Sequence, residues 1–222
     1  MLEMRVDLRL YALVDPEHAG GYSLPDLARR VVQGGATLVQ LRDKRGQTRE
    51  MVAQARAIKA VLAPLGVPLI VNDRVDVALA SGAHGVHLGQ DDMDAADARR
   101  LLGPEAIIGL SVKTMPEAQA APLQLLSYVA IGAVFPTTSK DNSTQIGAEG
   151  LRQIAAEIRA RMPGFPVGAI AGITETNAAD VIAAGADGIC AISALSSAPD
   201  PAAAAKKLRG IIDTALEKRG KR

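Results

Sequence analysis

The chain has 222 residues, of which 48% are hydrophobic and 22% charged, as in an ordinary globular domain. Its 25 Lys and Arg residues almost cancel 24 Asp and Glu, and only 2% of residues are aromatic, so the composition argues against nucleic-acid binding. The single cysteine, Cys190, cannot form an internal disulfide. With no apolar run near the ~18 residues of a membrane span and no apolar signal core at the start, these features predict a cytoplasmic protein without a membrane partner.

Short runs of Val, Ile, Leu and Ala alternate with segments of helical periodicity along the chain, which is typical of parallel strands buried on both faces. The expected strands are 8–14, 37–41, 68–71, 85–88, 107–111, 128–135, 167–170 and 187–192. The expected helices are 27–32 (with a cap at Ser23), 48 to about 66, 75–80, 94–102, 151–161, 177–183 and 200–218.

Eight strand–helix units averaging about 28 residues have the spacing of a compact barrel. No Pro/Ser linker or shift in composition marks a boundary between them. The sequence therefore predicts one domain, residues 1–222, folded as an α/β TIM barrel, (β/α)₈. An open doubly wound sheet is the structural alternative. The short basic tail 218–222 is expected to be a solvated end.

Three polar side chains at alternate positions end the second expected strand. Gln40, Arg42 and Lys44 project from one face of an extended chain. In a barrel the chemistry lies at the carboxyl ends of the strands. We interpret this face as an anion clamp, in which Arg42 offers a planar fork and Lys44 a point charge. The alternative is a solvated strand end with ordinary charges.

Carboxylates follow the third and fourth expected strands. Asp73 comes after the third, and Asp91 and Asp92 come after the fourth. Two carboxylates from neighbouring loops, without a His or Cys partner, suit a hard cation such as Mg²⁺ that is completed by substrate phosphate oxygens. The alternative is that these residues are helix N-caps, a role that Asp fills well.

The loop after the sixth strand, at 136–142, is rich in hydroxyl groups and contains Lys140. Hydroxyls, backbone N–H groups and a cation at a barrel rim predict a phosphate or diphosphate site. The ends of strands seven and eight are the usual phosphate pocket of such barrels, and Gly172 permits close backbone approach there. The alternative is a flexible Ser/Thr surface loop.

Three other residues are expected to be structural. His84 and His87 are three apart on a strand and so face opposite sides, which makes them a poor chelate. Cys190 lies in an apolar strand without a cationic neighbour in sequence, which favours an inert buried thiol over a nucleophile.

Taken together, these segments resemble the thiamine-phosphate synthase (thiamine-phosphate pyrophosphorylase) family, in the family's order from Tyr11 to about Ser193. The pattern Q-x-R-x-K is met at 40–44, the N-D pair at 72–73, the G-Q-[DE]-D segment at 89–92 and the P-T-x-[TS]-K loop at 136–140. The resemblance implies a transferase that joins 4-amino-2-methyl-5-hydroxymethylpyrimidine diphosphate to hydroxyethylthiazole phosphate. The products would be thiamine phosphate and diphosphate, formed by a Mg²⁺-assisted, dissociative substitution.

The resemblance also implies roles for individual residues. It assigns Mg²⁺ to Asp73 and Asp92, and the catalytic positive charges to Arg42, Lys44 and Lys140. The pyrimidine diphosphate would be bound by Gln40, Arg42, Lys44, Asn72, Ser111 and Lys140. The thiazole phosphate would be bound by Thr137, Thr138, Ser139, Gly172, Ile192 and Ser193.

Two positions depart from the family pattern, and both concern the thiazole phosphate. Ala171 stands where the family usually has glycine, and Ser139 stands for the commoner threonine. Three other functions remain open: a thiazole tautomerase-like isomerase, a Schiff-base lyase and a non-catalytic binding paralogue on the same barrel. The sequence determines neither homo-oligomer formation nor whether the segment 137–147 closes as a lid.

Overall fold

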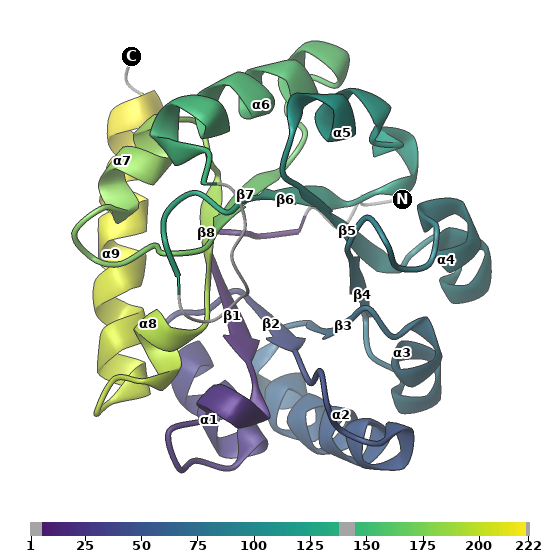
Figure 1. Ribbon diagram of the computed structural model, residues 1–222. Helices are drawn as coiled ribbons and strands as arrows, with labels where there is room; N and C mark the ends of the chain where they lie inside the picture. Colours follow the sequence, from purple (N-terminus) through teal and green to yellow (C-terminus); the bar gives the residue numbers. More distant parts are fainter. Residues whose placement is uncertain (1–5, 138–144, 221–222) are drawn as a thin grey trace.

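A computed structural model describes residues 6–137 and 145–220 of the chain. Within these residues eight parallel strands pair in chain order, and the first also pairs with the last (Figure 1). The strands are β1 (Leu10–Val14), β2 (Leu38–Leu41), β3 (Leu69–Asn72), β4 (Gly85–Leu88), β5 (Ile107–Val112), β6 (Tyr128–Ile131), β7 (Val167–Ile170) and β8 (Gly188–Ala191). The sheet is thus a closed barrel, which confirms the expected fold and excludes the open doubly wound sheet.

Helices surround the barrel, one or more after each strand (Figure 1). They are α1 (Leu24–Gln33), α2 (Thr48–Leu62), α3 (Val75–Ser81), α4 (Ala95–Leu102), α5 (Met115–Ala120), α6 (Gly147–Arg161), α7 (Ala178–Ala183), α8 (Ser193–Ser196) and α9 (Pro201–Gly220). Short 3-10 helices lie at Pro16–His18, Ala63–Leu65 and Leu123–Leu125. The expected cap of α1 is present, because Ser23 Oγ accepts from the Asp26 N–H at 3.3 Å.

The sixth strand is shorter than predicted. We expected it over 128–135, but β6 ends at Ile131. Beyond that point the N–H groups of Val134 and Phe135 still donate to the carbonyls of Ile170 and Ala171, at 3.1 and 3.2 Å. The carbonyls of Ala133 and Val134 instead accept from the N–H groups of Ile146 and Gly147, each at 3.0 Å, so this segment bonds to both the end of β7 and the start of α6. The sequence analysis also missed α5 and α8, whose six and four residues are too few to show a helical period.

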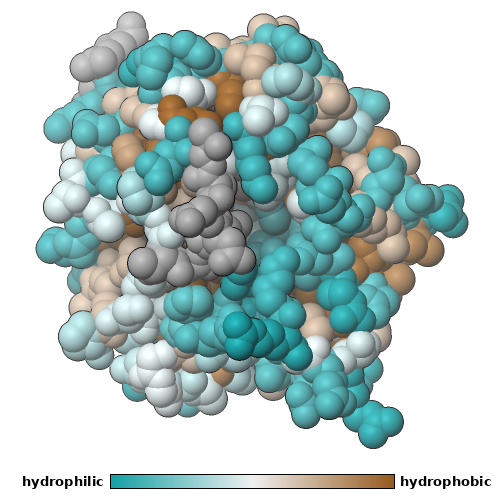
Figure 2. All heavy atoms as spheres, viewed as in Figure 1, coloured by the Kyte–Doolittle hydropathy of each residue, from teal (hydrophilic) through white to brown (hydrophobic). Residues whose placement is uncertain are grey.

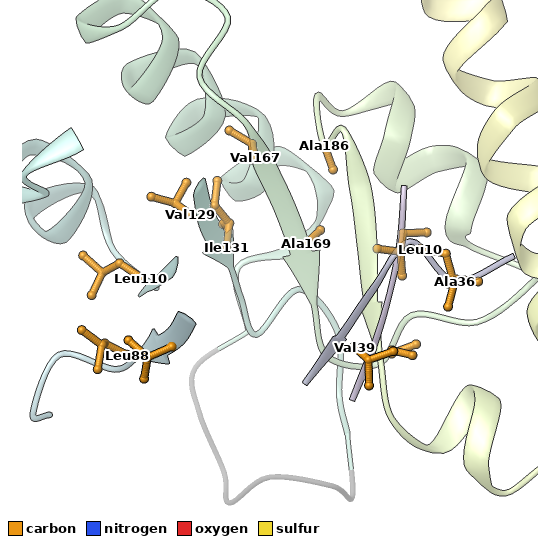
Figure 3. Packing of buried hydrophobic residues seen from close by; sticks show 14 of the residues in the cluster. Leu10, Ala36, Val39, Leu88, Leu110, Val129, Ile131, Val167, Ala169 and Ala186 are labelled. Atoms are coloured by element: carbon orange, nitrogen blue, oxygen red, sulfur yellow. The ribbon is translucent and has the colours of Figure 1, made fainter. Parts of the chain in front are cut away.

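Apolar side chains pack in two layers, because successive residues of a barrel strand point alternately inward and outward. The outer layer fills the space between the strands and the helices (Figure 3). The inner layer fills the barrel itself, and Tyr11 and Tyr128 are its largest fully buried side chains. Gly109 leaves room for one of these rings, since a Cβ there would lie 2.1 Å from Tyr128 Cζ. The packed interior leaves the carboxyl ends of the strands as the place for a site.

Candidate active site at the barrel mouth

Polar side chains from the ends of several strands line a cavity of about 410 Å³ at the barrel mouth, here called the polar cavity. Hydrophilic residues predominate over the middle of the face shown in Figure 2. The residues predicted from sequence that line the polar cavity are Gln40, Arg42, Lys44, Asn72, Asp73, Asp92 and Ser111. The structure therefore brings seven predicted positions, from the ends of four strands, to one place.

Gln40, Arg42 and Lys44 all face the polar cavity, as their alternate spacing requires. Gln40 and Arg42 are 1% and 9% exposed, which contradicts the alternative of a solvated strand end for these two. Lys44 is about half-exposed and forms an ion pair with Asp73. Both cations of the predicted clamp have an acidic partner, because Arg42 Nη1 pairs with the buried Asp15.

Asp73 and Asp92 are neighbouring carboxylates on the wall of the polar cavity. Burial raises the pKa of Asp73 above its ordinary value, Lys44 lowers it, and the nearby Asp92 carboxylate raises it again, leaving it raised overall. Asp92 is held in place by the Gly89 N–H, which donates to Asp92 Oδ2 at 2.6 Å. The arrangement concentrates negative charge at one side of the cavity.

The helix-capping alternative for these carboxylates is wrong. Helix α3 begins after Arg74 without any side-chain cap. Helix α4 is capped by Asp94, whose Oδ1 accepts from the Ala96 N–H at 2.7 Å. Asp73 and Asp92 are therefore not needed to start the helices that follow them.

A chain of hydrogen bonds crosses the barrel from Gln40 to Ser111. Gln40 Nε2 donates to the Tyr11 hydroxyl, and the Tyr128 hydroxyl also donates to Tyr11, at 3.0 Å. His87 Nδ1 lies 2.9 Å from the Tyr128 hydroxyl, and its Nε2 lies 2.9 Å from Ser111 Oγ. Because the Tyr128 hydroxyl donates its hydrogen to Tyr11, it can only accept from His87 Nδ1. In a neutral ring we therefore assign the hydrogen to Nδ1, and Nε2 accepts from the Ser111 hydroxyl.

The two tyrosines of this hydrogen-bond chain are uncharged. Burial raises the pKa of both Tyr11 and Tyr128 well above the ordinary value, so both hydroxyls stay protonated. Gln40 Oε1 is buried and has no hydrogen-bond partner in the described part of the chain. A ligand in the polar cavity with an N–H group would satisfy it.

The sequence analysis did not identify His87 as a residue of the site, nor Asp15 as the partner of Arg42. His84 and His87 do face opposite sides, and His84 Nδ1 accepts from the Leu69 N–H at 3.1 Å, but His87 lines the polar cavity. The signal for His87 was its inward position, opposite Asn72 in the β3–β4 register. The signal for Asp15 was the one that singled out Asp73, namely a carboxylate that directly follows a buried strand.

A second cavity of about 540 Å³ adjoins the first and is here called the loop cavity. Its lining residues are Pro136, Thr137, 170–174 and 190–194, which include the predicted Thr137, Gly172, Ile192 and Ser193. Ile170, Ala171 and Cys190 line both cavities and form a shared wall. Thr138, Ser139 and Lys140, with most of the proposed lid, lie outside the described residues.

Ala171 and Gly172 form a tight left-handed turn at the shared wall, with φ of 82° and 65°. A Cβ on Gly172 would lie 2.3 Å from the Pro136 carbonyl oxygen, so only glycine fits there. Ala171, the departure from the family pattern, adopts a conformation that costs a non-glycine residue about 1–2 kcal/mol.

We therefore expect Ala171→Gly to raise the free energy of unfolding by about 0.5–1 kcal/mol, the relief of strain less the entropy cost of glycine. Urea denaturation would measure it. Ala169→Gly, two residues earlier in β7, is the matched control, because Ala169 is buried and has no positive φ. The free energy of unfolding of that control should fall by about 0.5–1 kcal/mol. Equal losses in the two variants would show that Ala171 is unstrained.

Two further features bear on the chemistry. None of the eight described strands contains a lysine, so this part of the chain offers no desolvated strand lysine for a Schiff-base lyase. Across residues 6–137 and 145–220, no group of three or more His, Cys, Asp and Glu side chains is placed to hold a metal ion.

Over the same residues, no helix has the length and apolar character needed to cross a bilayer.

Comparisons with known proteins agree with this geometry. The family model described as thiamine monophosphate synthase matches residues 10–195. The chain is 51% identical to the thiamine-phosphate synthase of Agrobacterium fabrum, over 97% of this chain and 98% of that one. It is 48% identical to the thiamine-phosphate synthase of Albidiferax ferrireducens, over 93% and 92% of the two chains.

Solved structures give the same result. The thiamine phosphate pyrophosphorylase of Pyrococcus furiosus superposes with a TM-score of 0.83 at 37% identity, covering 96% of this chain and 99% of that one. A 3-hexulose-6-phosphate synthase superposes with a TM-score of 0.63 at 19% identity, which shows the shared barrel alone. The family model and the high identity over nearly full length establish that the chain belongs to the thiamine monophosphate synthase family.

Proposed function

We propose that the barrel mouth joins 4-amino-2-methyl-5-hydroxymethylpyrimidine diphosphate to hydroxyethylthiazole phosphate, releasing diphosphate and forming thiamine phosphate. The observation that carries the proposal is the pair of adjoining cavities. One is lined by cations and carboxylates, and the other by backbone and hydroxyl groups. Two anionic substrates held in them would meet at the shared wall of Ile170, Ala171 and Cys190. The names of the relatives support the same reaction.

The polar cavity would hold the pyrimidine diphosphate. Arg42 and Lys44 would bind its diphosphate by charge-assisted hydrogen bonds, aided by Lys140. Gln40 would bind the ring, since its unpartnered Oε1 needs an N–H donor and an aminopyrimidine offers one. Asn72 and Ser111 line the same cavity and would complete the contacts.

The donor set at Asp73 and Asp92 fits Mg²⁺. This ion is usually held by one or two carboxylates, with water and substrate phosphate oxygens in its other positions, so a larger acidic cluster is not required. The two carboxylates are close enough for Asp92 to raise the pKa of Asp73, a repulsion that a bound cation would relieve. When bound, the ion would stabilise negative charge on the departing diphosphate.

The chain's own residues would act by positioning and charge. Arg42 and Lys44 would stabilise the leaving group as the C–O bond lengthens, while the electron-rich aminopyrimidine delocalises the positive charge left on its methylene carbon. The thiazole nitrogen then attacks that carbon. No enzyme nucleophile is needed. Cys190 is buried and would form part of the cavity wall, where it packs so closely against Gly168 that a Cβ on that glycine would lie 3.2 Å from the Cys190 sulfur.

The loop cavity would hold the thiazole phosphate through Thr137, Gly172, Ile192 and Ser193, together with Thr138 and Ser139. We expect Gly172→Ala to raise the KM for this substrate about tenfold or more. The reason is that an overpacked contact of this kind costs about 1–3 kcal/mol. The KM for the pyrimidine diphosphate should change little. Steady-state kinetics with each substrate varied in turn would measure both.

Gly164→Ala is the matched control for that prediction. Gly164 also has a left-handed φ, of 75°, but a Cβ there would meet nothing within 4 Å. Its variant carries the backbone strain without the collision, so its KM values should match those of the wild type. If both variants raise the thiazole phosphate KM equally, backbone strain and not space in the loop cavity is the cause.

The direct test of the proposed function is to incubate the purified protein with both substrates, with Mg²⁺ or with EDTA, and to follow thiamine phosphate by mass spectrometry. Product with Mg²⁺ and none with EDTA is expected. No product in either case, from folded protein, would favour the tautomerase-like or binding-only alternatives. Product in EDTA would show that the reaction does not require the proposed Mg²⁺. The chain has a single cysteine and so cannot form an internal disulfide, which supports a reducing, cytoplasmic location as part of the proposal.

A further inference from the structure

Asp15 is a buried carboxylate that directly follows β1 and is only 1% exposed. Its Oδ1 accepts from the Glu17 N–H at 2.8 Å, and its Oδ2 forms the ion pair with Arg42 Nη1. His18 Nδ1 lies 3.6 Å from the same Oδ2, too far for a hydrogen bond. Asp15 does not line the polar cavity itself, so any effect on a ligand must pass through Arg42.

Arg42 is held by Asp15 at one nitrogen only. The guanidinium makes no other hydrogen bond to the described residues, although it lines the polar cavity and offers five N–H donors. The donors not used by Asp15 are therefore available to a ligand in that cavity. The guanidinium charge is buried, and the Asp15 carboxylate is what makes that burial tolerable.

We propose that Asp15 is a positioning residue for the pyrimidine diphosphate, holding the Arg42 guanidinium in the orientation that grips the substrate. The proposal rests on the proposed assignment of Arg42 to that substrate. A long arginine side chain loses much conformational entropy when it binds a ligand. Because the ion pair with Asp15 already fixes the Arg42 side chain in the folded protein, that entropy is lost on folding and not on binding. Asp15 thereby improves binding of the diphosphate without touching it.

A second ion pair joins the same two loops. It provides a comparison that distinguishes positioning of Arg42 by Asp15 from simple tethering of the two loops. Arg45 Nε lies 2.9 Å from Glu17 Oε1, and both side chains are far more exposed than Asp15 and Arg42. Neither lines the polar cavity. If the role of Asp15 were only to tie the loop after β1 to the loop after β2, this pair would share it.

The test is steady-state kinetics of Asp15→Asn, which keeps the shape and the acceptor for the Glu17 N–H but removes the charge. We expect the KM for the pyrimidine diphosphate, and the inhibition constant of inorganic diphosphate, to rise about 10-fold or more, the usual range for partners that orient a ligating group. The KM for the thiazole phosphate should stay within twofold of the wild type. Glu17→Gln should leave all three constants unchanged.

A double-mutant cycle with Arg42→Gln ties the effect to Arg42. If Asp15 acts through Arg42, adding Asp15→Asn to Arg42→Gln changes the pyrimidine diphosphate KM by less than twofold. If the effects of the two substitutions on the pyrimidine diphosphate KM multiply in the double variant, the proposal is overturned. An equal rise of both substrate KM values in Asp15→Asn would also overturn it. If circular dichroism shows that Asp15→Asn is unfolded, Asp15→Ser, which keeps an oxygen for the Glu17 N–H, takes its place with the same expectations.

The outcomes also separate this proposal from the proposed function. An inactive wild-type protein would contradict the function itself, whatever the variants do. An active wild type with an Asp15→Asn variant that matches it in both KM values and in diphosphate inhibition would leave the function standing and reject the positioning role.

Discussion

Asp92→Ala is expected to lower turnover about 10²–10³-fold and to raise the Mg²⁺ concentration needed for half-maximal activity. The reason is geometric. Asp92 lies beside Asp73 in the polar cavity and is oriented by the Gly89 N–H at 2.6 Å. Removing it leaves one carboxylate where the proposed site has two, and the charge that develops on the leaving diphosphate loses part of its stabilisation. A Mg²⁺ titration of the initial rate would measure both effects.

Asp94→Ala is the matched control for this prediction. Asp94 is two residues further along and caps α4, but it does not line the polar cavity. Its variant should lose about 1 kcal/mol of stability through the lost cap while keeping the wild-type Mg²⁺ titration. An Asp92→Ala protein with an unchanged rate and titration would contradict the metal assignment.

Arg42→Lys is expected to lower kcat/KM for the pyrimidine diphosphate about 10²-fold, although the charge is conserved. In the structure the Arg42 guanidinium pairs with Asp15 through one nitrogen and has further donors for a ligand. An ammonium group is a single point, so it cannot hold Asp15 and grip a diphosphate in the same geometry. Steady-state kinetics under saturating thiazole phosphate would measure the change.

Arg45→Lys provides the comparison. Arg45 is an exposed arginine of the same loop, paired with Glu17. Its replacement should leave the kinetics unaltered, because exposed ion pairs contribute little and Arg45 is outside the cavity. Wild-type kinetics in Arg42→Lys would remove Arg42 from the site and, with it, the positioning role of Asp15.

The alternation of inward and outward residues explains how much of the site could be predicted. Gln40, Arg42 and Lys44 were found because three polar residues at a spacing of two run on from the end of an otherwise apolar strand. Ser111 and Asp73 were found because polar residues that follow a buried strand gather at one edge of a barrel. The same rules apply to His87 and Asp15, but each stood alone, and a lone polar residue carries no pattern.

Other features required the tertiary structure. The path of the chain after β6 depends on hydrogen bonds that join Val134 to Gly147 and to Ile170, neither of which is adjacent in sequence. The orientation of His87 depends on Tyr128, 41 residues further along the chain. The strain at Ala171 becomes visible only from its φ of 82°. Local sequence patterns define which residues form the strands, whereas these contacts depend on how the barrel closes.

The wall shared by the two cavities has a consequence for inhibitor design. Ile170, Ala171 and Cys190 line both spaces, so a ligand in one cavity and a ligand in the other would contact the same three residues. A single molecule with a diphosphate mimic at one end and a phosphate mimic at the other can therefore span them. Tethering the two halves makes the second binding step intramolecular, and a short linker matched to the span gives an effective concentration in the millimolar range. Such a bisubstrate compound should compete with both substrates at once.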